Sequence, residues 1–314
     1  MSFSKQQWGL ILGGSSGFGL ATGHKLSEHG LNLVIVHRDR RGAAKRIEPE
    51  FAAMRERGVQ VVTFNADALS AQERARIVAE LGSTLGDSGK VRLLLHSIAL
   101  GNLKPIVSYR TGHRRAELLE RLSAATGVGV EALAGTLKDL ATEGFDELAP
   151  LVIDVDYGNQ VIDEEDLSGT IYNMGTSLLG WVRALLDADL FDTDARVLGL
   201  TSEGNEVAWR GYSAISAAKV AMESISRSMA LELAPRGIRS NIVQAGITAT
   251  PASSLIPGIE LMKAAARQRN PFGRLTRPED VANVIYLLCR DEAAWINGTI
   301  VRVDGGEHIS GGNS

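Results

Sequence analysis

Short apolar runs alternate with amphipathic segments along the chain. Segments with helical periodicity, including Gly19–Glu28, Arg46–Arg57 and Ala71–Leu85, separate runs that have the length of buried strands. Those runs are Trp8–Leu12, Leu31–Val36, Val59–Phe64, Val91–Leu95, Arg196–Leu200, Arg239–Val243 and Thr299–Val303. Continuous apolar strands are typical of a parallel sheet that is covered on both faces. The pattern predicts the α/β class, a doubly wound parallel sheet (Rossmann fold), as one domain over residues 1–314.

One connection is too long for a simple crossover helix. Almost eighty residues separate the strand end near His96 from the helix near Gly175. About residues 108–166 are predicted to be an insertion, with helical patterns at Arg114–Ala125 and Val130–Glu143. The insertion is either a surface elaboration or subunit contact, or a lid over the substrate, and the sequence leaves these open.

Composition and charge exclude several classes of protein. The 314 residues carry a net charge of −4, which gives no support to nucleic-acid binding. Cys289 is the single cysteine, so the chain has no internal disulfide and no cysteine cluster for a metal. No window has the ~18 uninterrupted apolar residues of a membrane span, and the N-terminus lacks a signal-peptide pattern. We therefore expect a cytoplasmic protein without a metal site.

A glycine-rich loop follows the first predicted strand and precedes a predicted helix. Gly13, Gly17 and Gly19 form a G-x3-G-x-G pattern. In this context the first glycine permits a tight turn, the second lets the backbone approach a pyrophosphate, and the third lets the helix pack against the sheet. The alternative is a merely structural turn. The loop predicts a dinucleotide site that also includes Ser15, Ser16 and Phe18.

The end of the second predicted strand bears on the choice between NADH and NADPH. An acidic residue there accepts hydrogen bonds from the adenosine ribose, whereas this chain has Arg38 directly after His37. A guanidinium suits a 2′-phosphate, and Ser15 or Ser16 is placed to donate a hydroxyl to the same group. NADPH is therefore favoured, although Asp39 is an argument for NADH. Asp67 and Ala68, after the third strand, are expected beside the adenine.

Tyr212 and Lys219 are the candidate chemical residues. They are seven residues apart, about two helical turns, so both can face one side of the same helix. A nearby ammonium stabilises a phenolate and makes the tyrosine hydroxyl a better proton donor. Lys219 is then expected at the nicotinamide ribose and Tyr212 at the substrate oxygen.

This segment resembles the short-chain dehydrogenase/reductase family. The glycine pattern, Asp67, the His96–Ala99 tail and Val303–Gly306 support the resemblance, which covers almost the whole chain except the insertion. Most members have Tyr-x3-Lys, but here Ile215 stands four residues before Lys219. The Tyr-x6-Lys spacing, the His-Ser-Ile tail and Ala245–Thr250 are similar to the enoyl-[acyl-carrier-protein] reductases of fatty-acid synthesis.

The resemblance implies an NADPH-dependent reduction of an enoyl thioester. Hydride would reach C3 of a trans-2-enoyl chain while Tyr212 stabilises the enolate oxygen. It further implies that Lys219 binds the ribose, that Ser97 and Ile98 lie along the cofactor, and that Thr248 and Thr250 meet its carboxamide and pyrophosphate.

One departure keeps other functions open. Ser202 stands where many enoyl reductases have a second tyrosine and where ordinary family members keep a catalytic serine. Ser202 therefore either holds the substrate carbonyl or caps the strand end, and a carbonyl reductase or alcohol dehydrogenase is the alternative function. A non-catalytic dinucleotide-binding protein is a third, against which the presence of both Tyr212 and Lys219 argues.

Two predicted partners follow from charge and from the resemblance. An acidic acyl carrier protein would favour a basic rim. Two clusters of basic residues could form this rim: Arg110, His113, Arg114 and Arg115, and Lys263, Arg267 and Arg269. The alternative for each cluster is a solvated helix face with no partner. Relatives form homotetramers through the helix that carries the catalytic pair, here Ala217–Glu232, whose small residues suit such a contact.

Overall fold

A seven-stranded parallel sheet runs through the body of the protein. The computed structural model describes residues 3–86, 88–108, 113–153 and 155–311. The strands lie in the order β3-β2-β1-β4-β5-β6-β7, and every pairing is parallel. They are β1 (Gln7–Leu12), β2 (Asn32–His37), β3 (Val61–Asn65), β4 (Lys90–His96), β5 (Phe191–Ser202), β6 (Ile238–Ala245) and β7 (Ile300–Val303). All seven predicted strands are present, and the predicted fold class is confirmed.

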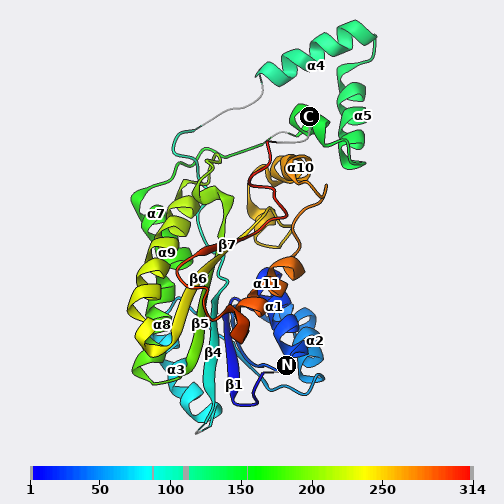
Figure 1. Cartoon of the computed structure of the whole chain (residues 1–314). Helices are drawn as coiled ribbons and strands as arrows, with labels where there is room; N and C mark the ends of the chain where they lie inside the picture. The colour runs from blue at the N-terminus through cyan, green and yellow to red at the C-terminus, as the bar shows by residue number, and fades with distance from the viewer. Residues whose placement is uncertain (1–2, 87, 109–112, 154, 312–314) are drawn as a thin grey trace.

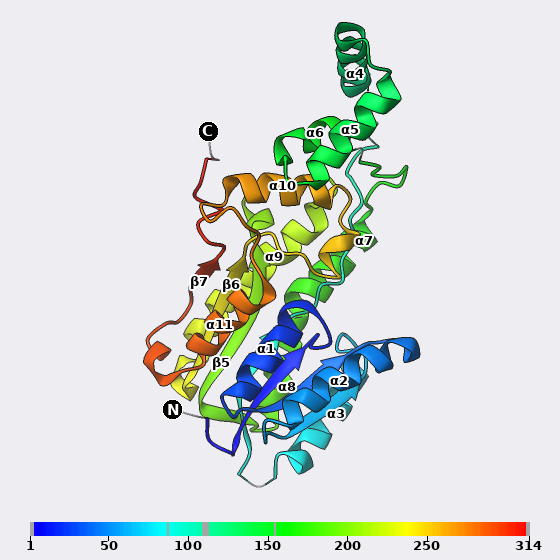
Figure 2. The same cartoon turned by 90° about the vertical axis from the view of Figure 1, so that its right-hand side faces the viewer.

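Two layers of helices cover the sheet, one on each face (Figures 1 and 2). Alternate residues of β2 show why both faces need cover: Leu33 and Ile35 pack on one side, and Val34 and Val36 on the other. The first side is covered by α1 (Gly17–Glu28), α2 (Ala44–Arg55) and α11 (Pro278–Leu288). The second is covered by α3 (Ala71–Thr84), α8 (Ser177–Asp187) and α9 (Ser213–Glu232).

The strand order reverses between β1 and β4. The chain builds β2 and β3 to one side of β1, and then β4 to β7 to the other side. Leu12 pairs with His96 at the ends of these two strands, and the Ser97 amide donates to the Leu12 carbonyl at 2.9 Å. A crevice at the carboxyl ends of the strands is expected at such a switch point, and ligands of doubly wound folds bind there.

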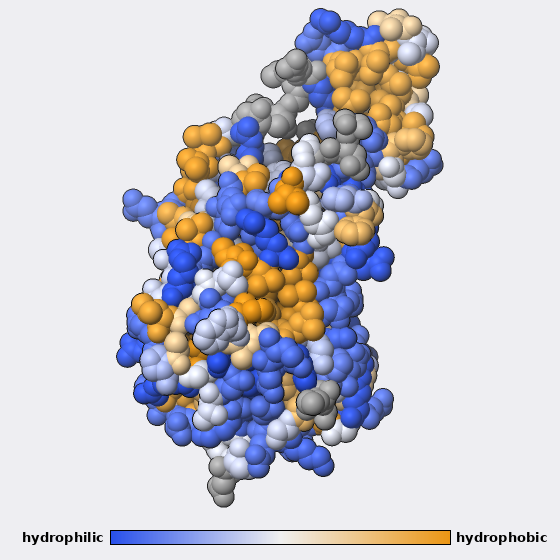
Figure 3. All heavy atoms as spheres, in the orientation of Figure 1, coloured by the Kyte–Doolittle hydropathy of each residue, from blue (hydrophilic) through white to orange (hydrophobic). Residues whose placement is uncertain are grey.

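A helical arm projects beyond the body, next to α10 (Ile259–Arg269) (Figures 1 and 2). It contains α4 (His113–Thr126), α5 (Val130–Thr142) and α6 (Ala149–Val152), so both predicted helices are present. Figure 3 shows apolar side chains gathered on one side of the arm. The arm contacts α10 through a two-bond ion pair between Arg267 and Asp146, with Nε to Oδ2 at 2.7 Å. That the segment is an insertion within one domain stays a prediction.

After the arm, the chain returns to the body through α7 (Glu164–Ile171) and a π-helical turn, Tyr172–Thr176, which leads into α8. This turn packs against α9: a Cβ on Gly175 would lie 2.6 Å from the Ala218 carbonyl oxygen, so only glycine fits. The turn thereby brings Met174 beside the helix that carries Tyr212 and Lys219. Among the described helices, none is both long enough and apolar enough to cross a bilayer.

Candidate active site

Two adjoining cavities open at the carboxyl ends of the strands. We call the first the cofactor cleft, since it is lined by the glycine-rich loop and the ends of β2 and β3. We call the second the apolar pocket; it is lined by the ends of β5 and β6, the start of α9 and part of α10. The two share Phe18, Ser97, Ile98, Ala99, Thr250 and Ala252. A molecule in the cleft therefore reaches the pocket directly.

The glycine-rich loop has the close approaches that its pattern predicts. Gly13 has φ +87°, and a Cβ there would lie 2.5 Å from the Ser97 carbonyl oxygen. A Cβ on Gly19 would lie 2.2 Å from the Gly13 carbonyl oxygen. Gly17, with φ +53°, begins α1, whose first amides point out of the helix. The loop, with Ser15, Ser16 and Phe18 lining the cleft, fits the pyrophosphate of a dinucleotide.

Arg38, Asp67 and Ala68 line the far end of the cofactor cleft. Arg38 Nη1 lies 3.1 Å from Asp67 Oδ2, so these two predicted ligands form an ion pair with each other. Both side chains are largely exposed, 56% and 40%, so the pair is weak and open to exchange with a ligand. The Trp181 indole donates to the Ala68 carbonyl at 2.8 Å and fixes that edge of the cleft.

Asp39, the residue that argued for NADH, is held within the chain. His37 Nδ1 lies 2.9 Å from Asp39 Oδ2, and Arg46 Nη2 lies 4.0 Å from Asp39 Oδ1. Arg46 also donates to the Ser15 carbonyl at 3.4 Å, which places a second guanidinium beside the glycine-rich loop. Sequence reasoning missed Arg46, because nothing in its spacing distinguishes it from the other arginines of this basic stretch.

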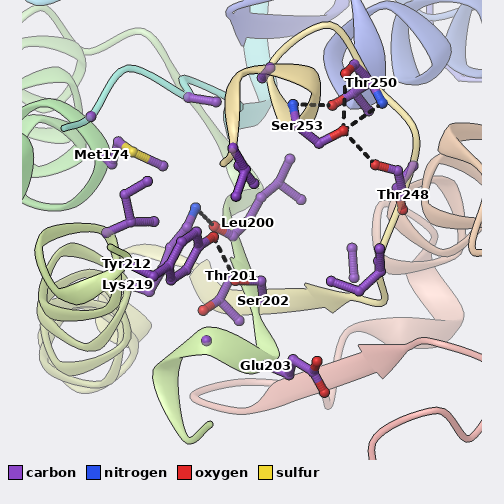
Figure 4. Close-up of a pocket in the computed structure, with 18 of the residues that line it drawn as sticks. Met174, Leu200, Thr201, Ser202, Glu203, Tyr212, Lys219, Thr248, Thr250 and Ser253 are labelled. Atoms are coloured by element: carbon purple, nitrogen blue, oxygen red, sulfur yellow. Dashed lines mark hydrogen bonds between the residues drawn. The ribbon is translucent and has the colours of Figure 1, made fainter. Parts of the chain in front are cut away.

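The catalytic candidates meet in the apolar pocket (Figure 4). Tyr212 is the residue before α9, and Lys219 lies on its second turn, so both face the pocket. Tyr212 Oη lies 3.4 Å from Ser202 Oγ, and Lys219 Nζ donates to the Leu200 carbonyl at 2.6 Å. Ile215 also lines the pocket. The structure brings together the three residues that the sequence selected for chemistry.

Burial controls the protonation of these groups. Burial raises the pKa of Tyr212; the Ser202 hydroxyl opposes this effect and the charge of Glu203 adds to it. The net shift of the Tyr212 pKa is thus upward, and the predicted stabilisation of its phenolate by Lys219 is not among the causes of this shift and stays a prediction. Burial lowers the pKa of Lys219 to about 8, against the opposing charge of Glu223. Tyr212 thus stays a neutral hydroxyl at physiological pH and acts as a hydrogen-bond donor.

His96 takes a structural place at the end of β4. Its Nε2 lies 2.9 Å from Ser177 Oγ at the start of α8. Burial, assisted by the positive charge of Lys219, lowers the pKa of His96 to about 3. The imidazole is therefore neutral at physiological pH, and its contact with Ser177 joins the end of β4 to α8.

A loop after β6 covers the junction of the two cavities. Thr248 and Thr250 face it, and Ser253 holds their backbones: its hydroxyl donates to the Thr248 carbonyl at 2.8 Å and accepts from the Thr250 amide at 2.9 Å (Figure 4). A Cβ on Gly17 would lie 3.4 Å from Thr250 Cγ2, so the loop reaches the glycine-rich loop. These positions are compatible with the predicted roles of both threonines, which stay predictions.

Sequence reasoning missed most of the apolar lining of the pocket. The missed side chains come from segments far apart in the chain and have no shared sequence signal: Leu103, Met174, Trp209, Ile256, Ile259 and Met262. No described residue of α4, α5 or α6 is among the lining residues. The apolar character of the lining suits a hydrocarbon chain.

The described members of the two predicted basic clusters are engaged within the chain. Arg110 and the side chains of His113 and Arg114 lie outside the described part of the chain, and Arg115 donates to the Leu151 and Val152 carbonyls at 2.8 Å. The second cluster is paired with acids: Lys263 with Glu260, Arg267 with Asp146, and Arg269 with Glu203.

Comparisons with known proteins identify the family of the chain. The family profile described as enoyl-(acyl carrier protein) reductase matches residues 156–308. A cis-4-hydroxycyclohexanecarboxylate dehydrogenase from Sinomonas cyclohexanicum is 32% identical over 262 residues, which cover 79% of this chain and 95% of that protein. The NADH-dependent enoyl-[acyl-carrier-protein] reductase of Aquifex aeolicus is 35% identical over 135 residues, covering 43% of this chain and 50% of the relative.

A solved structure extends the fold comparison over the whole chain. The crystal structure of an enoyl-[acyl-carrier-protein] reductase from Aquifex aeolicus superposes with a TM-score of 0.71 at 21% identity. The superposition covers 98% of this chain and 99% of that one.

The doubly wound sheet, the glycine-rich loop and the relatives together define the class, an oxidoreductase of a kind that binds a nicotinamide dinucleotide. The relatives agree in class although their named reactions differ. The chain belongs to the short-chain dehydrogenase/reductase family.

Proposed function

We propose that this protein is an NADPH-dependent enoyl-thioester reductase. The observation that carries the proposal is the position of the pocket hydroxyl. Tyr212 enters the apolar pocket one helical turn before Ile215, which occupies the place that most family members give to tyrosine. Ile215 has no proton to donate, so Tyr212 is the residue of α9 that meets the substrate.

The displacement suits the geometry of an enoyl thioester. In a ketone, the carbon that receives hydride bears the oxygen that must be protonated. In an enoyl thioester, hydride joins C3 and the negative charge appears on the thioester oxygen, beyond C2. The Tyr212 hydroxyl lies three residues, about 4.5 Å along the helix axis, before the position of Ile215. From there it can reach the thioester oxygen without any change in the position of α9.

A bound NADPH supplies the hydride. Tyr212 donates a hydrogen bond to the developing enolate oxygen, and the neutral hydroxyl favoured by burial is the form that donates. Lys219, which faces the same pocket from α9, would bind the ribose hydroxyls of the cofactor and keep the local potential positive. A proton from solvent then joins C2, so the C=C bond becomes a single bond and the product is a saturated thioester.

The preference for NADPH rests on the end of β2. Arg38 and Arg46 flank the cleft there, and the carboxylate of Asp39 is engaged by His37. A 2′-phosphate would replace Asp67 as the partner of Arg38 and add a charge-assisted contact. NADH lacks this group and gains nothing from the two guanidinium groups.

The substrate class follows from the pocket lining and the resemblance. The apolar pocket accepts an acyl chain, carried as a thioester by coenzyme A or by acyl carrier protein. The α10 arginines are less suited to the carrier than their number suggests, because Asp146 and Glu203 already offset their charge. We further propose a cytoplasmic homotetramer that assembles through α9.

A carbonyl reductase is the second candidate, because Ser202 Oγ lies 3.4 Å from Tyr212 Oη. A serine and a tyrosine hydroxyl side by side can hold a ketone oxygen, and the relative from Sinomonas cyclohexanicum is named as a dehydrogenase. The absence of a proton donor at Ile215 favours the enoyl thioester over the ketone.

NADPH oxidation with paired substrates tests the proposal. We expect turnover of crotonyl-coenzyme A and little turnover of acetoacetyl-coenzyme A under the same conditions. Reduction of acetoacetyl-coenzyme A without any reduction of crotonyl-coenzyme A or a longer enoyl thioester would assign the protein to the second candidate.

A further inference from the structure

A cluster of charges with two buried carboxylates borders the apolar pocket. Arg269, the last residue of α10, places Nη2 2.7 Å from Glu203 Oε1 and 3.4 Å from Glu307 Oε1. Glu203 directly follows Ser202, and Glu307 lies in the tail after β7. We call Arg269, Glu203 and Glu307 the Arg269 cluster. It joins three segments that are distant in sequence.

The carboxylates of this cluster are almost fully removed from water. The side chain of Glu203 is 4% exposed and that of Glu307 is 1% exposed. One guanidinium serves both carboxylates, and Glu203 Oε2 is buried without a hydrogen-bond partner. Buried carboxylates are costly unless they are paired, so two of them around a single arginine require an explanation.

Each member of the cluster adjoins a part of the active site. Glu307 accepts the Ile247 amide at 3.3 Å, at the start of the loop that carries Thr248 and Thr250. Glu203 lines the apolar pocket beside Ser202 (Figure 4). Arg269 ends the helix whose Ile259 and Met262 line the same pocket.

We propose that Arg269 is a positioning residue, which fixes α10 over the apolar pocket by binding Glu203 and Glu307. The inference rests on the proposed function only for the identity of the substrate, since the pocket and the cluster are features of the fold. Arg269 touches no reacting atom. It sets the distance between the apolar wall of α10 and the catalytic residues at the end of β5, and thereby controls how tightly the acyl chain is held.

The electrostatics of the cluster make this positioning sensitive to pH. Burial raises the pKa of Glu307 to about 7; the Ile247 amide and Arg269 oppose the rise, and Glu203 and Asp304 add to it. Asp304 accepts the Gly306 and His308 amides, and His308 Nε2 pairs with Glu206 at 2.9 Å. Glu307 thus gains or loses its proton near neutrality, and its bond to Arg269 changes with it.

The primary experiment compares Arg269→Gln with Arg274→Gln in the full chain. Arg274 pairs with Asp280 at 2.6 Å outside both cavities, so it is a matched loss of one ion pair. For Arg269→Gln we expect KM for an enoyl-coenzyme A substrate to rise roughly 5- to 30-fold while kcat changes less than about twofold. Amide hydrogen exchange over residues 259–269 should accelerate by about tenfold, and Arg274→Gln should change neither.

A double variant separates the loss of positioning from a general loss of stability. Arg269→Gln leaves two buried carboxylates without their cation, whereas Arg269→Gln combined with Glu203→Gln removes one of these charges. We expect the double variant to regain thermal stability but to keep the raised KM and the fast exchange of α10. For the wild type we expect KM to change near pH 7, where Glu307 titrates, and the double variant should lose this change.

The outcome distinguishes this inference from the proposed function. If the wild type reduces no enoyl thioester, the proposed function fails, while hydrogen exchange still tests the cluster. If Arg269→Gln matches Arg274→Gln in both exchange over α10 and KM, Arg269 has no positioning role.

Discussion

The two ends of β4, β5 and β6 differ in how completely their charged and polar side chains are hydrogen-bonded. At the amino ends, Arg92, Arg196 and Arg239 lie side by side around Asp194. At the carboxyl ends lie Ser202 and the loop that leads to Tyr212. The charged groups at the amino ends of these strands are therefore paired within the fold. The polar groups at the carboxyl ends include donors and acceptors that have no partner among the described residues.

The arginines at the amino ends are tied to backbone as well as to acid. Arg92 Nη2 donates to the Cys289 carbonyl at 2.9 Å, and Arg196 Nε donates to the Leu288 carbonyl at 2.9 Å. These carbonyls end α11, where a helix presents partial negative charge. Burial alone would raise the pKa of Asp194, but hydrogen bonds from Arg196 and Arg92 outweigh it and hold the pKa below its ordinary value.

The loop of residues 203–211, which leads from β5 to Tyr212, has the opposite character. Three of its buried polar atoms make no hydrogen bond in the described structure, namely Glu203 Oε2, Asn205 Oδ1 and Trp209 Nε1, and the same holds for Ser213 Oγ at the start of α9. Unsatisfied buried groups lower stability, and Glu203 and Trp209 line the apolar pocket, where a ligand can complete their hydrogen bonds. We infer that the side chains at the amino ends of the strands stabilise the sheet, whereas those at the carboxyl ends are placed to bind a ligand.

The largest expected effect is on turnover, from Tyr212→Phe. Removing a single oxyanion donor costs about 10²- to 10³-fold in kcat. The ring fills the same space, so thermal stability and NADPH affinity should stay close to wild type. Steady-state kinetics with crotonyl-coenzyme A and a fluorescence titration with NADPH check both parts. Unchanged kcat would remove Tyr212 from the chemistry.

The next effect is on stability, from Asp194→Asn at the other end of the strands. The change leaves Arg92 and Arg196 buried without their shared acid; since Asp194 is 32% exposed, we expect a loss of about 2–3 kcal/mol, below the full cost of breaking a buried pair. Urea unfolding measures this, and kcat should not change.

The sign of the pH dependence provides a control for that variant. A lowered carboxyl pKa stabilises the fold above the unfolded value of about 3.9, and this contribution is lost as pH falls. The difference in stability between wild type and Asp194→Asn should therefore shrink toward acid pH. A constant difference would show that the charge of Asp194 is not the cause.

A smaller effect concerns the cofactor, from Arg38→Ala. The pair with Asp67 is exposed, so stability should change by less than about 1 kcal/mol. Loss of a charge-assisted contact to a 2′-phosphate should raise KM for NADPH by roughly 10- to 100-fold. KM for NADH should stay the same, and an equal rise for both cofactors would contradict the assignment of Arg38.

The smallest expected effect is a decline of kcat/KM at basic pH, caused by deprotonation of Lys219. Lys219, with its pKa lowered to about 8 by burial, loses its charge as pH rises through that value. We expect kcat/KM to decline on the basic side with an apparent pKa near 8, since kcat/KM reports groups of the free enzyme. A profile that stays flat to pH 9.5 would show that the charge of Lys219 is dispensable.

The sequence predicted the sheet well because local patterns determine it. Runs such as Val91–Leu95 and Arg239–Val243 are buried on both faces and lie between helical segments. The start of β5 was missed: the strand begins at Phe191, before the predicted start at Arg196, and Asp192 and Asp194 interrupt the apolar pattern there. In the fold, the Gln7 side chain donates to Asp192, and Arg92, Arg196 and Arg239 bind Asp194. Only the folded sheet brings those partners together.

The sequence predicted those parts of the candidate site whose residues lie close together in the chain at a characteristic spacing. The glycine-rich loop and the Tyr212–Lys219 spacing are local features, and the structure places them around one pair of cavities. The Arg269 cluster joins residues 203, 269 and 307 and has no local signal. The direction of the pKa shift of Tyr212 depends on burial, which a sequence pattern does not report.

Isotope transfer tests the central claim most directly, namely that hydride goes to C3 of an enoyl thioester. The enzyme is given NADPH carrying deuterium at the transferable C4 position, with crotonyl-coenzyme A, and the product is examined by NMR. We predict butyryl-coenzyme A with one deuterium on C3. Deuterium found only in 3-hydroxybutyryl-coenzyme A, formed from acetoacetyl-coenzyme A in a parallel reaction, with none transferred to the enoyl substrate, would contradict the account.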